Sequence, residues 1–227
     1  FIDEVHRLPA LAQETLYSAM EDRRVLIRVM VAQKETRLVH VELPAFTLVA
    51  ATTLPGILSK PFRDRFVASY HLDFYPPEAL ARIVDRAADK LGFRLTADAA
   101  SEIARRGRGT PRIALQLLRR VRDYAQGYLG LDRADAGIAV NALNREGIDD
   151  AGLSQQDSAY LRTIAERFGG GPAGLSAIAA TMSDDAGTLE GVVEPFLLWS
   201  GYISRTGHGR VLTDKARRHL TSTQRRT

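Results

Sequence analysis

Phe1-Ile2-Asp3-Glu4 is the stretch that decides the fold, because two apolar residues run directly into two carboxylates. This is the pattern of a buried strand that ends in an acidic pair, and such pairs at strand ends are typical of magnesium sites that serve a bound nucleotide. In this interpretation Asp3 binds Mg²⁺, directly or through water, and Glu4 accepts a proton from the water that attacks the γ-phosphate. A solvated strand end explains the dipeptide equally well, so its context has to decide.

A phosphate-binding loop of the pattern G-x-x-x-x-G-K-S/T normally precedes such a strand, and it does not occur in these 227 residues. The sequence contains no Gly-Lys dipeptide, and it opens with Phe1 rather than Met. We therefore expect the chain to be the C-terminal part of a nucleoside triphosphatase, which on its own neither binds ATP well nor hydrolyses it.

Composition excludes several classes of site. The chain has no cysteine, which rules out a disulfide framework, a thiolate zinc site and a cysteine nucleophile, and its five histidines have no paired ligand spacing. We therefore expect no metal other than Mg²⁺. No run of about 18 apolar residues occurs to span a bilayer, so the expected location is the cytoplasm, with no membrane partner.

The positive charge is concentrated near the C-terminal end. The formal net charge is +4, and residues 200–227 contain seven arginine or lysine residues against one acid, Asp214. A local excess of this kind indicates a polyanionic partner such as DNA.

Residues 1–75 alternate between helical and strand patterns, which predicts an α/β unit. Residues 46–51 are apolar without alternation, which predicts a strand covered on both faces that ends at Thr52-Thr53. We expect an amphipathic helix at residues 8–20, a β-hairpin at 25–43 and two further strands at 46–51 and 70–74.

The rest of the chain predicts two smaller domains. Residues 76–147 show helical periodicity alone, with four helices, of which the second and third begin at cap residues Thr96 and Thr110. Residues 144–152 are polar and contain glycine, which predicts a linker. Residues 148–227 predict three helices followed by a hairpin, the order of a winged helix, which is a relative of the helix-turn-helix.

Two pairs of polar residues in the α/β unit have a structural and a functional interpretation. Thr52 and Thr53 either end a strand or orient the attacking water and sense the γ-phosphate. Arg63 and Arg65 either form a surface ion-pair cluster with Asp64 or supply an arginine finger to the nucleotide of a neighbouring subunit.

Three further features suggest contacts with ligands or partners. Arg112 lies in the first turn of a helix, where a cation opposes the helix dipole and a bound phosphate would compensate it. The apolar hairpin at residues 25–43 either packs under its own domain or docks a partner protein, since a two-stranded ribbon cannot bury both faces alone. Arg205 and Arg210 flank a glycine-containing turn and suit contacts with DNA phosphates.

Four motifs follow one another in an order that is known from one family. They are Phe1-Ile2-Asp3-Glu4-Val5-His6-Arg7-Leu8, Ala51-Thr52-Thr53, Pro61-Phe62-Arg63-Asp64-Arg65-Phe66 and Arg108-Gly109-Thr110-Pro111-Arg112-Ile113-Ala114. Together they resemble the RuvB family, the bacterial Holliday-junction branch-migration motors of the AAA+ class. The resemblance covers nearly the whole chain and continues through Phe168-Gly169-Gly170 and Gly201-Tyr202-Ile203.

The resemblance implies a fold and a set of catalytic residues. The fold would be the C-terminal part of an AAA+ ATPase domain at residues 1–75, a helical lid at 76–147 and a winged helix at 148–227. Asp3 and Glu4 would be the Walker B pair, Thr52 or Thr53 would be the first sensor, and Arg65 would be the trans-acting finger.

It also implies ligands and partners. ATP and Mg²⁺ would be the cofactors. Asp3 would bind the metal, and Arg63, Pro111 and Arg112 would contact the nucleotide. Arg112 would be the second sensor. The partners would be four-way junction and duplex DNA, the protein RuvA and five further copies of the chain in a hexameric ring. RuvA would dock on the hairpin at Val29, Met30 and Val31, and DNA would contact Arg205, His208 and Arg210.

Besides the absent phosphate-binding loop, the chain departs from the family pattern at three places. Lys60-Pro61-Phe62-Arg63 stands where the family has Ser-Pro-Leu-Arg, and the tip of the first hairpin lacks a glycine-proline turn. At the wing tip Gly207-His208 replaces Pro-Arg, so a histidine, the weaker cation, stands where the family has a DNA-contacting arginine.

The sequence thus predicts part of an ATP-hydrolysing motor that drives branch migration of Holliday junctions in recombination and DNA repair. One alternative is a clamp-loader-like AAA+ subunit, which shares the acidic pair, the sensors and the finger but is disfavoured by the winged helix. The other is a non-catalytic winged-helix scaffold that binds DNA.

Overall fold

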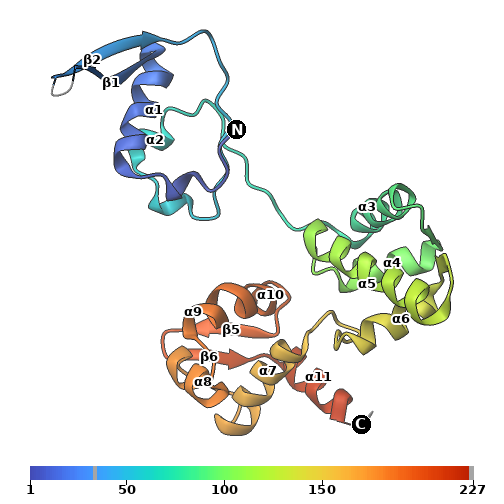
Figure 1. Cartoon of the computed structure of the whole chain (residues 1–227). Helices are drawn as coiled ribbons and strands as arrows, with labels where there is room; N and C mark the ends of the chain where they lie inside the picture. The colour runs from blue at the N-terminus through green and yellow to red at the C-terminus, as the bar shows by residue number, and fades with distance from the viewer. Residues whose placement is uncertain (33–34, 225–227) are drawn as a thin grey trace. The chain divides into compact units, whose positions relative to one another are not determined.

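The computed structural model describes residues 1–32 and 35–224, which form two compact units, Phe1–Leu72 and Asp73–Thr227 (Figure 1). One hydrophobic core lies in the first unit, and two larger cores lie in the second.

The first unit is organised around α1 (Ala10–Asp22), which packs against segments from both ends of the unit. Its core contains Val5 from the 3-10 helix η1 (Val5–Arg7), Leu58, and Phe62 from α2 (Lys60–Arg63), which follows η2 (Pro55–Ile57). The Phe62 ring lies 5.5 Å from the ring of Tyr17 on α1. This core holds the segment after the acidic pair and the arginine-bearing segment together beside α1.

The predicted hairpin is confirmed. β1 (Arg24–Ala32) pairs antiparallel with β2 (Glu35–Glu42), next to α1 in Figure 1, and the register is irregular between Met30 and Ala32. Leu26 and Ile27 are both partly exposed, and successive strand residues point to opposite faces. The ribbon therefore presents apolar side chains on both faces.

Two other predicted strands are not formed. Residues 46–51 make a single parallel bridge, from Ala50 to Ile2, and Val49 is half exposed, so the expectation of a strand covered on both faces is wrong here. Residues 70–74 belong to no strand. A strand needs a hydrogen-bonded neighbour along its length, and the described residues offer these runs only the bridge to Ile2.

The lid core forms as the helical periodicity predicts. The apolar stripes of its helices meet in one cluster, in which Leu80, Ile103 and Leu118 are fully buried. The helices are α3 (Pro77–Lys90), α4 (Ala97–Arg106), α5 (Pro111–Leu129) and α6 (Ala136–Arg145).

Cap chemistry explains where the lid helices begin. The Thr96 hydroxyl accepts the Ala99 N–H and caps α4 as expected. Thr110 precedes α5 but makes no side-chain cap bond, because its hydroxyl donates to the Gly107 carbonyl instead. α6 starts about three residues later than the pattern suggests, since β4 (Arg133–Ala134) pairs in parallel with β3 (Arg94–Leu95) and Asp135 then caps the helix.

The winged helix is confirmed as three helical segments followed by a hairpin. Ser154 and Asp157 form a capping box at the start of its first helix. Its third helix is interrupted by a π-helical turn just before Pro195. The elements are α7 (Gln155–Arg167), α8 (Leu175–Met182), α9 (Ala186–Thr188), η3 (Leu189–Val193), α10 (Glu194–Trp199), β5 (Ile203–Thr206), β6 (Gly209–Leu212) and α11 (Asp214–Gln224).

Two lid arginines hold the segment that the sequence predicts as a linker. Arg106 is fully buried and donates to the Asn144 side chain, the Ile148 carbonyl and the carboxylates of Glu102 and Asp150, at 2.7 to 3.0 Å. Buried charges of this kind are tolerated only when they are paired and hydrogen-bonded. Residues 144–152 are therefore an ordered joint rather than a flexible connector.

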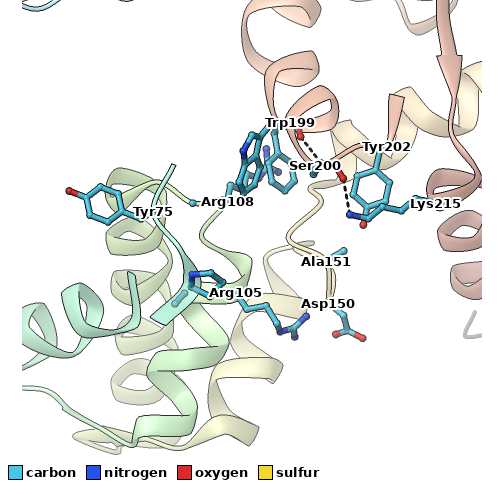
Figure 2. A pocket seen from close by; sticks show the side chains of 13 residues that line it. Tyr75, Arg105, Arg108, Asp150, Ala151, Trp199, Ser200, Tyr202 and Lys215 are labelled. Atoms are coloured by element: carbon cyan, nitrogen blue, oxygen red, sulfur yellow. Dashed lines mark hydrogen bonds between the residues drawn. The ribbon is translucent and has the colours of Figure 1, made fainter. Parts of the chain in front are cut away.

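Arg108 extends this joint into the winged helix. Its Nε donates to the Gly152 carbonyl at 2.9 Å, its Nη2 pairs with Asp157, and its guanidinium lies 4.7 Å from the centre of the Phe196 ring. Figure 2 shows the adjoining pocket, of about 250 Å³, with Arg105 and Arg108 on the lid side and Trp199, Tyr202 and Lys215 on the winged-helix side. None of the predicted site residues lines it.

Replacing Gly109 with alanine is expected to lower the free energy of unfolding by about 1–3 kcal/mol. Gly109 has φ +66°, and a Cβ added to it would lie 2.8 Å from the Phe74 Cβ. The Gly109 carbonyl accepts the Tyr75 N–H at 2.8 Å, which holds the two segments together. Urea unfolding of the chain measures the change. Gly127→Ala is the matched control, because that position within α5 is open and a helical glycine gains from alanine. Equal stability of the two variants would contradict the assigned geometry.

Candidate functional site

The acidic pair and the two threonines lie together because two chain segments run in parallel at this point. Ile2 and Ala50 form a parallel bridge, in which the Ile2 N–H donates to Val49 and the Ala51 N–H donates to Ile2, both at 2.9 Å. The residues that follow each segment therefore meet at one edge. The Glu4 carboxylate accepts the Thr53 N–H at 3.2 Å and the Thr53 hydroxyl at 3.0 Å.

His6 belongs to this cluster, although it is not among the predicted site residues. Its Nδ1 lies 2.8 Å from the Thr52 hydroxyl oxygen and 3.2 Å from a Glu4 carboxylate oxygen. The two contacts link the threonine pair to the acid. The only available signal was the position of His6 two residues after Glu4.

Glu4 is held in an unusual backbone conformation. Its φ and ψ are both 49°, in the left-handed region that residues other than glycine rarely adopt and that recurs at functional sites. The Thr53 N–H lowers the pKa of the Glu4 carboxyl below its usual value, against the raising effect of burial, and the Thr53 hydroxyl, His6 and Arg7 lower it further. The Glu4 carboxyl is therefore ionised at neutral pH.

Replacing Thr53 with valine is expected to raise the pKa of Glu4, because the hydroxyl donor is lost while the N–H remains. A carboxyl with a lowered folded-state pKa stabilises the fold above its unfolded pKa and loses that contribution as the pH falls through the folded value. The variant should therefore lose part of this stabilisation at neutral pH and none in strong acid. An NMR titration of the Glu4 carboxyl carbon measures the shift, with Thr15→Val as control, and an unchanged Glu4 titration would contradict the contact.

The Asp3 carboxylate is exposed beside this cluster, and its Oδ1 accepts the Glu4 N–H at 3.0 Å. No group of three acidic or histidine ligands occurs among the described residues. Mg²⁺ at nucleotide sites is commonly held by one or two carboxylates together with waters and phosphates, so this donor set fits it.

The two arginines of the α2 region differ in their surroundings. Arg63, the last residue of α2, is exposed. Arg65 folds back on its own unit, where it pairs with Glu21 at 2.7 Å, donates to the Pro61 carbonyl at 2.8 Å and lies over the Tyr17 ring. Its Nε is buried without a hydrogen-bond partner among the described residues.

Pro111 and Arg112 open α5 in the second unit. Arg112 is exposed in the first turn, and no side chain caps this end of the helix. The leading N–H groups of the 19-residue helix are thus free of any side-chain cap, and such groups attract anions.

The sequence predicts wing arginines that are available to DNA phosphates, but in the structure both arginines are paired with a carboxylate. Arg205 on β5 and Arg210 on β6 are register partners, and both donate to the buried Glu194. Arg205 keeps 44% of its side chain exposed and Arg210 keeps 15%. No pattern in the sequence points to Glu194, which precedes Arg205 by eleven residues. His208 is exposed at the tip, where its N–H donates to the Thr206 hydroxyl at 3.3 Å.

The predicted docking hairpin is described only in part. Val29 is 38% exposed on β1. Met30 and Val31 are the other two predicted docking residues, and their side chains lie outside the part of the chain that the structure describes. Among the described helices, none combines the length and the apolar character that a membrane span requires.

Three family models match the chain. They are the Holliday junction DNA helicase RuvB P-loop domain at residues 1–72, the RuvB AAA lid domain at 75–149 and the RuvB C-terminal winged-helix domain at 150–221. The matches together cover nearly all of the sequence, in the order that the fold predicts.

Named relatives agree with the models. The Holliday junction branch migration complex subunits RuvB of Streptococcus agalactiae serotypes Ia and III are each 47% identical over 221 residues, 97% of this chain and 66% of theirs. The chain thus spans slightly less than two thirds of their length. Among solved structures, the Thermotoga maritima RuvB branch migration motor is 42% identical, with a TM-score of 0.79 over 97% of this chain and 68% of that one. A point mutant of the same Thermotoga maritima protein gives a TM-score of 0.80.

Proposed function

The chain belongs to the RuvB family, and from this premise we propose that it acts as a motor subunit that couples ATP hydrolysis to branch migration of Holliday junctions. The observation that carries the proposal is the parallel bridge of Ile2 and Ala50, which brings Glu4 into contact with Thr53 and His6 into contact with Thr52. A solvated strand end does not require these contacts. They place an acid, two hydroxyl groups and an imidazole within hydrogen-bond distance of one another, which is the arrangement that activation of a water needs.

In the proposed mechanism Glu4 is the general base. Its lowered pKa keeps it ionised at neutral pH, and the Thr53 donors fix its orientation. Thr52 and Thr53 orient the attacking water and sense the γ-phosphate by hydrogen bonding. Asp3 would hold Mg²⁺, which neutralises charge on the phosphate oxygens when it is bound.

Three arginines would serve the nucleotide, together with Pro111. The uncapped start of α5 supports a role of Arg112 in binding the nucleotide. Pro111 at the first helical position presets the backbone there. Arg65 would act on the nucleotide of a neighbouring subunit in a homohexameric ring, with Arg63 beside it. In this chain the Arg65 guanidinium pairs with Glu21 and donates to the Pro61 carbonyl, so this role requires it to exchange these contacts for the phosphate.

The remaining surfaces would bind the partners. The two-faced apolar ribbon of β1 and β2, with Val29, Met30 and Val31, is proposed to dock RuvA. Arg205, His208 and Arg210 on the wing are proposed to contact the phosphates of the DNA arm. The proposed division is an ATPase portion at 1–75, a lid at 76–147 and a winged helix at 148–227, in a protein that works in the cytoplasm.

The test uses the protein that carries this chain together with its phosphate-binding loop. It is mixed with RuvA, a synthetic four-way junction and ATP, and the conversion of the junction into two duplexes is followed on a gel. Conversion that needs both ATP and RuvA is the expected result. Binding of the junction without any conversion would overturn the motor and leave a DNA-binding scaffold.

A further inference from the structure

The two wing arginines face each other across the hairpin. Arg205 and Arg210 are directly opposite in the register of β5 and β6. Like charges at such positions destabilise a hairpin, so the pair requires a counter-charge. The helical segment before the wing supplies it.

Glu194 is the inner counter-charge. It is fully buried, and its Oε1 accepts the Tyr160 hydroxyl at 2.5 Å and Arg210 Nε at 2.7 Å. Its Oε2 accepts Nε and Nη2 of Arg205, at 3.0 and 2.5 Å, and Arg210 Nη2 at 3.1 Å. Burial raises the pKa of Glu194, but donation from Arg210, Tyr160 and Arg205 outweighs it and the net shift is downward. One fixed carboxylate thus orients both guanidiniums and leaves one positive charge uncompensated.

Glu190 is the outer counter-charge. It lies on the π-helical turn η3, four residues before Glu194, and its carboxylate is 3.2 Å from Arg205 and 3.5 Å from Arg210. Half of its side chain is exposed, in contrast to Glu194. Single π-turns within helices recur at functional sites. With Glu190 in place the formal charges of the four side chains cancel, although the sequence suggests a strongly basic wing.

We propose that Glu190 is a displaceable anion that occupies the outward side of Arg205 until a phosphodiester group of the DNA backbone replaces it. Glu194 stays in place and keeps both guanidiniums oriented during the exchange. This inference rests on the proposed binding of DNA by the wing. Competition from Glu190 makes the contact between the wing and the DNA phosphate weaker than a contact made by two unpaired arginines. A weaker contact suits a subunit that has to release DNA after each step.

The exchange predicts a change in both affinity and salt dependence. In the native protein a phosphate that arrives at Arg205 releases counterions from the DNA, but the displaced Glu190 carboxylate takes up a cation in exchange, so this contact adds little to the salt dependence. In Glu190→Gln no carboxylate is set free, so the release of counterions from the DNA is not offset. We expect duplex affinity to rise by about two- to fivefold at low salt, the range of one exposed ion pair. The slope of log K against log salt should steepen by up to about one.

The measurement is fluorescence anisotropy of a labelled duplex with the full protein, at several salt concentrations. Glu166→Gln is the matched control, because it removes the same charge from an exposed position on α7 of the same domain. Glu190→Asp is the rescue variant and should return both the affinity and the slope toward the native values. Thermal melts of each variant confirm that the exposed substitutions leave the fold unchanged.

The outcomes separate this inference from the proposed function. An affinity and slope of Glu190→Gln equal to those of Glu166→Gln, or a weaker affinity, would overturn the displaceable anion while leaving DNA binding in place. Failure of the native protein to bind the duplex at all would overturn DNA binding by the wing, and the inference with it.

Discussion

Replacing Glu4 with glutamine is expected to lower junction-stimulated ATP turnover by about 10²–10⁴-fold, the usual contribution of a positioned general base. Glutamine keeps the shape of the side chain but cannot accept a proton from water. Its amide oxygen can still accept the Thr53 donors that hold Glu4 at 3.0 to 3.2 Å. Nucleotide and junction binding should therefore persist, and they can be measured with a fluorescent ATP analogue and with labelled junction DNA.

Glu14→Gln is the control for this substitution. Glu14 is exposed on α1, so the same chemical change there should leave turnover within about twofold of the native rate, as surface substitutions usually do. If Glu4→Gln kept more than about a tenth of the native turnover, the carboxylate would not be the general base.

Replacing Arg65 with alanine is expected to lower turnover by about 10³–10⁵-fold, the range found for arginine fingers. The guanidinium would be lost from the neighbouring subunit's nucleotide, where it is proposed to stabilise charge on the transferring phosphoryl group. The fold should suffer little, since the ion pair with the exposed Glu21 and the contact with the Tyr17 ring contribute about 1 kcal/mol each at most. Steady-state hydrolysis with RuvA and junction DNA gives the rate, and a thermal melt gives the stability.

Glu21→Gln separates this role from a structural one. It removes the carboxylate that pairs with Arg65 in the same chain and leaves the guanidinium intact. Turnover within a few-fold of native is expected for this variant. A loss as deep as that of Arg65→Ala would show that the contact between α1 and Arg65, rather than a neighbouring nucleotide, explains the effect.

Local patterns predict the helical parts of this fold well. The lid helices follow from apolar stripes at helical spacing, and the Thr96 cap places the start of α4 correctly. The wing hairpin follows from two β-rich runs around a glycine-containing turn. In each case the signal for the element lies in residues a few positions apart, so the sequence displays it directly.

Contacts between distant segments explain what the sequence does not predict. The apolar run at residues 46–51 resembles a strand, but strand formation depends on a neighbour, and only Ala50 finds one among the described residues. His6 meets Thr52 across 46 positions, and Arg108 meets Asp157 across 49. Neither pair leaves a periodic trace in the sequence.

The same limit applies to the wing. Arg205 and Arg210 are predictable as cations on a hairpin, but their charge balance is not. It depends on Glu190 and Glu194, which a helical segment with a π-turn brings under the hairpin. The number of cations in a sequence therefore overstates the free charge that a folded wing offers to DNA.

Each active centre is proposed to be completed by an arginine from the neighbouring subunit, and mixing two inactive variants tests this most directly. Glu4→Gln subunits retain Arg65, and Arg65→Ala subunits retain Glu4, so a ring assembled from both contains centres in which an intact Glu4 faces an intact Arg65. Random 1:1 assembly should restore about a quarter of the native junction-stimulated turnover. Turnover of the mixture no higher than that of either variant alone would contradict completion by a neighbouring subunit.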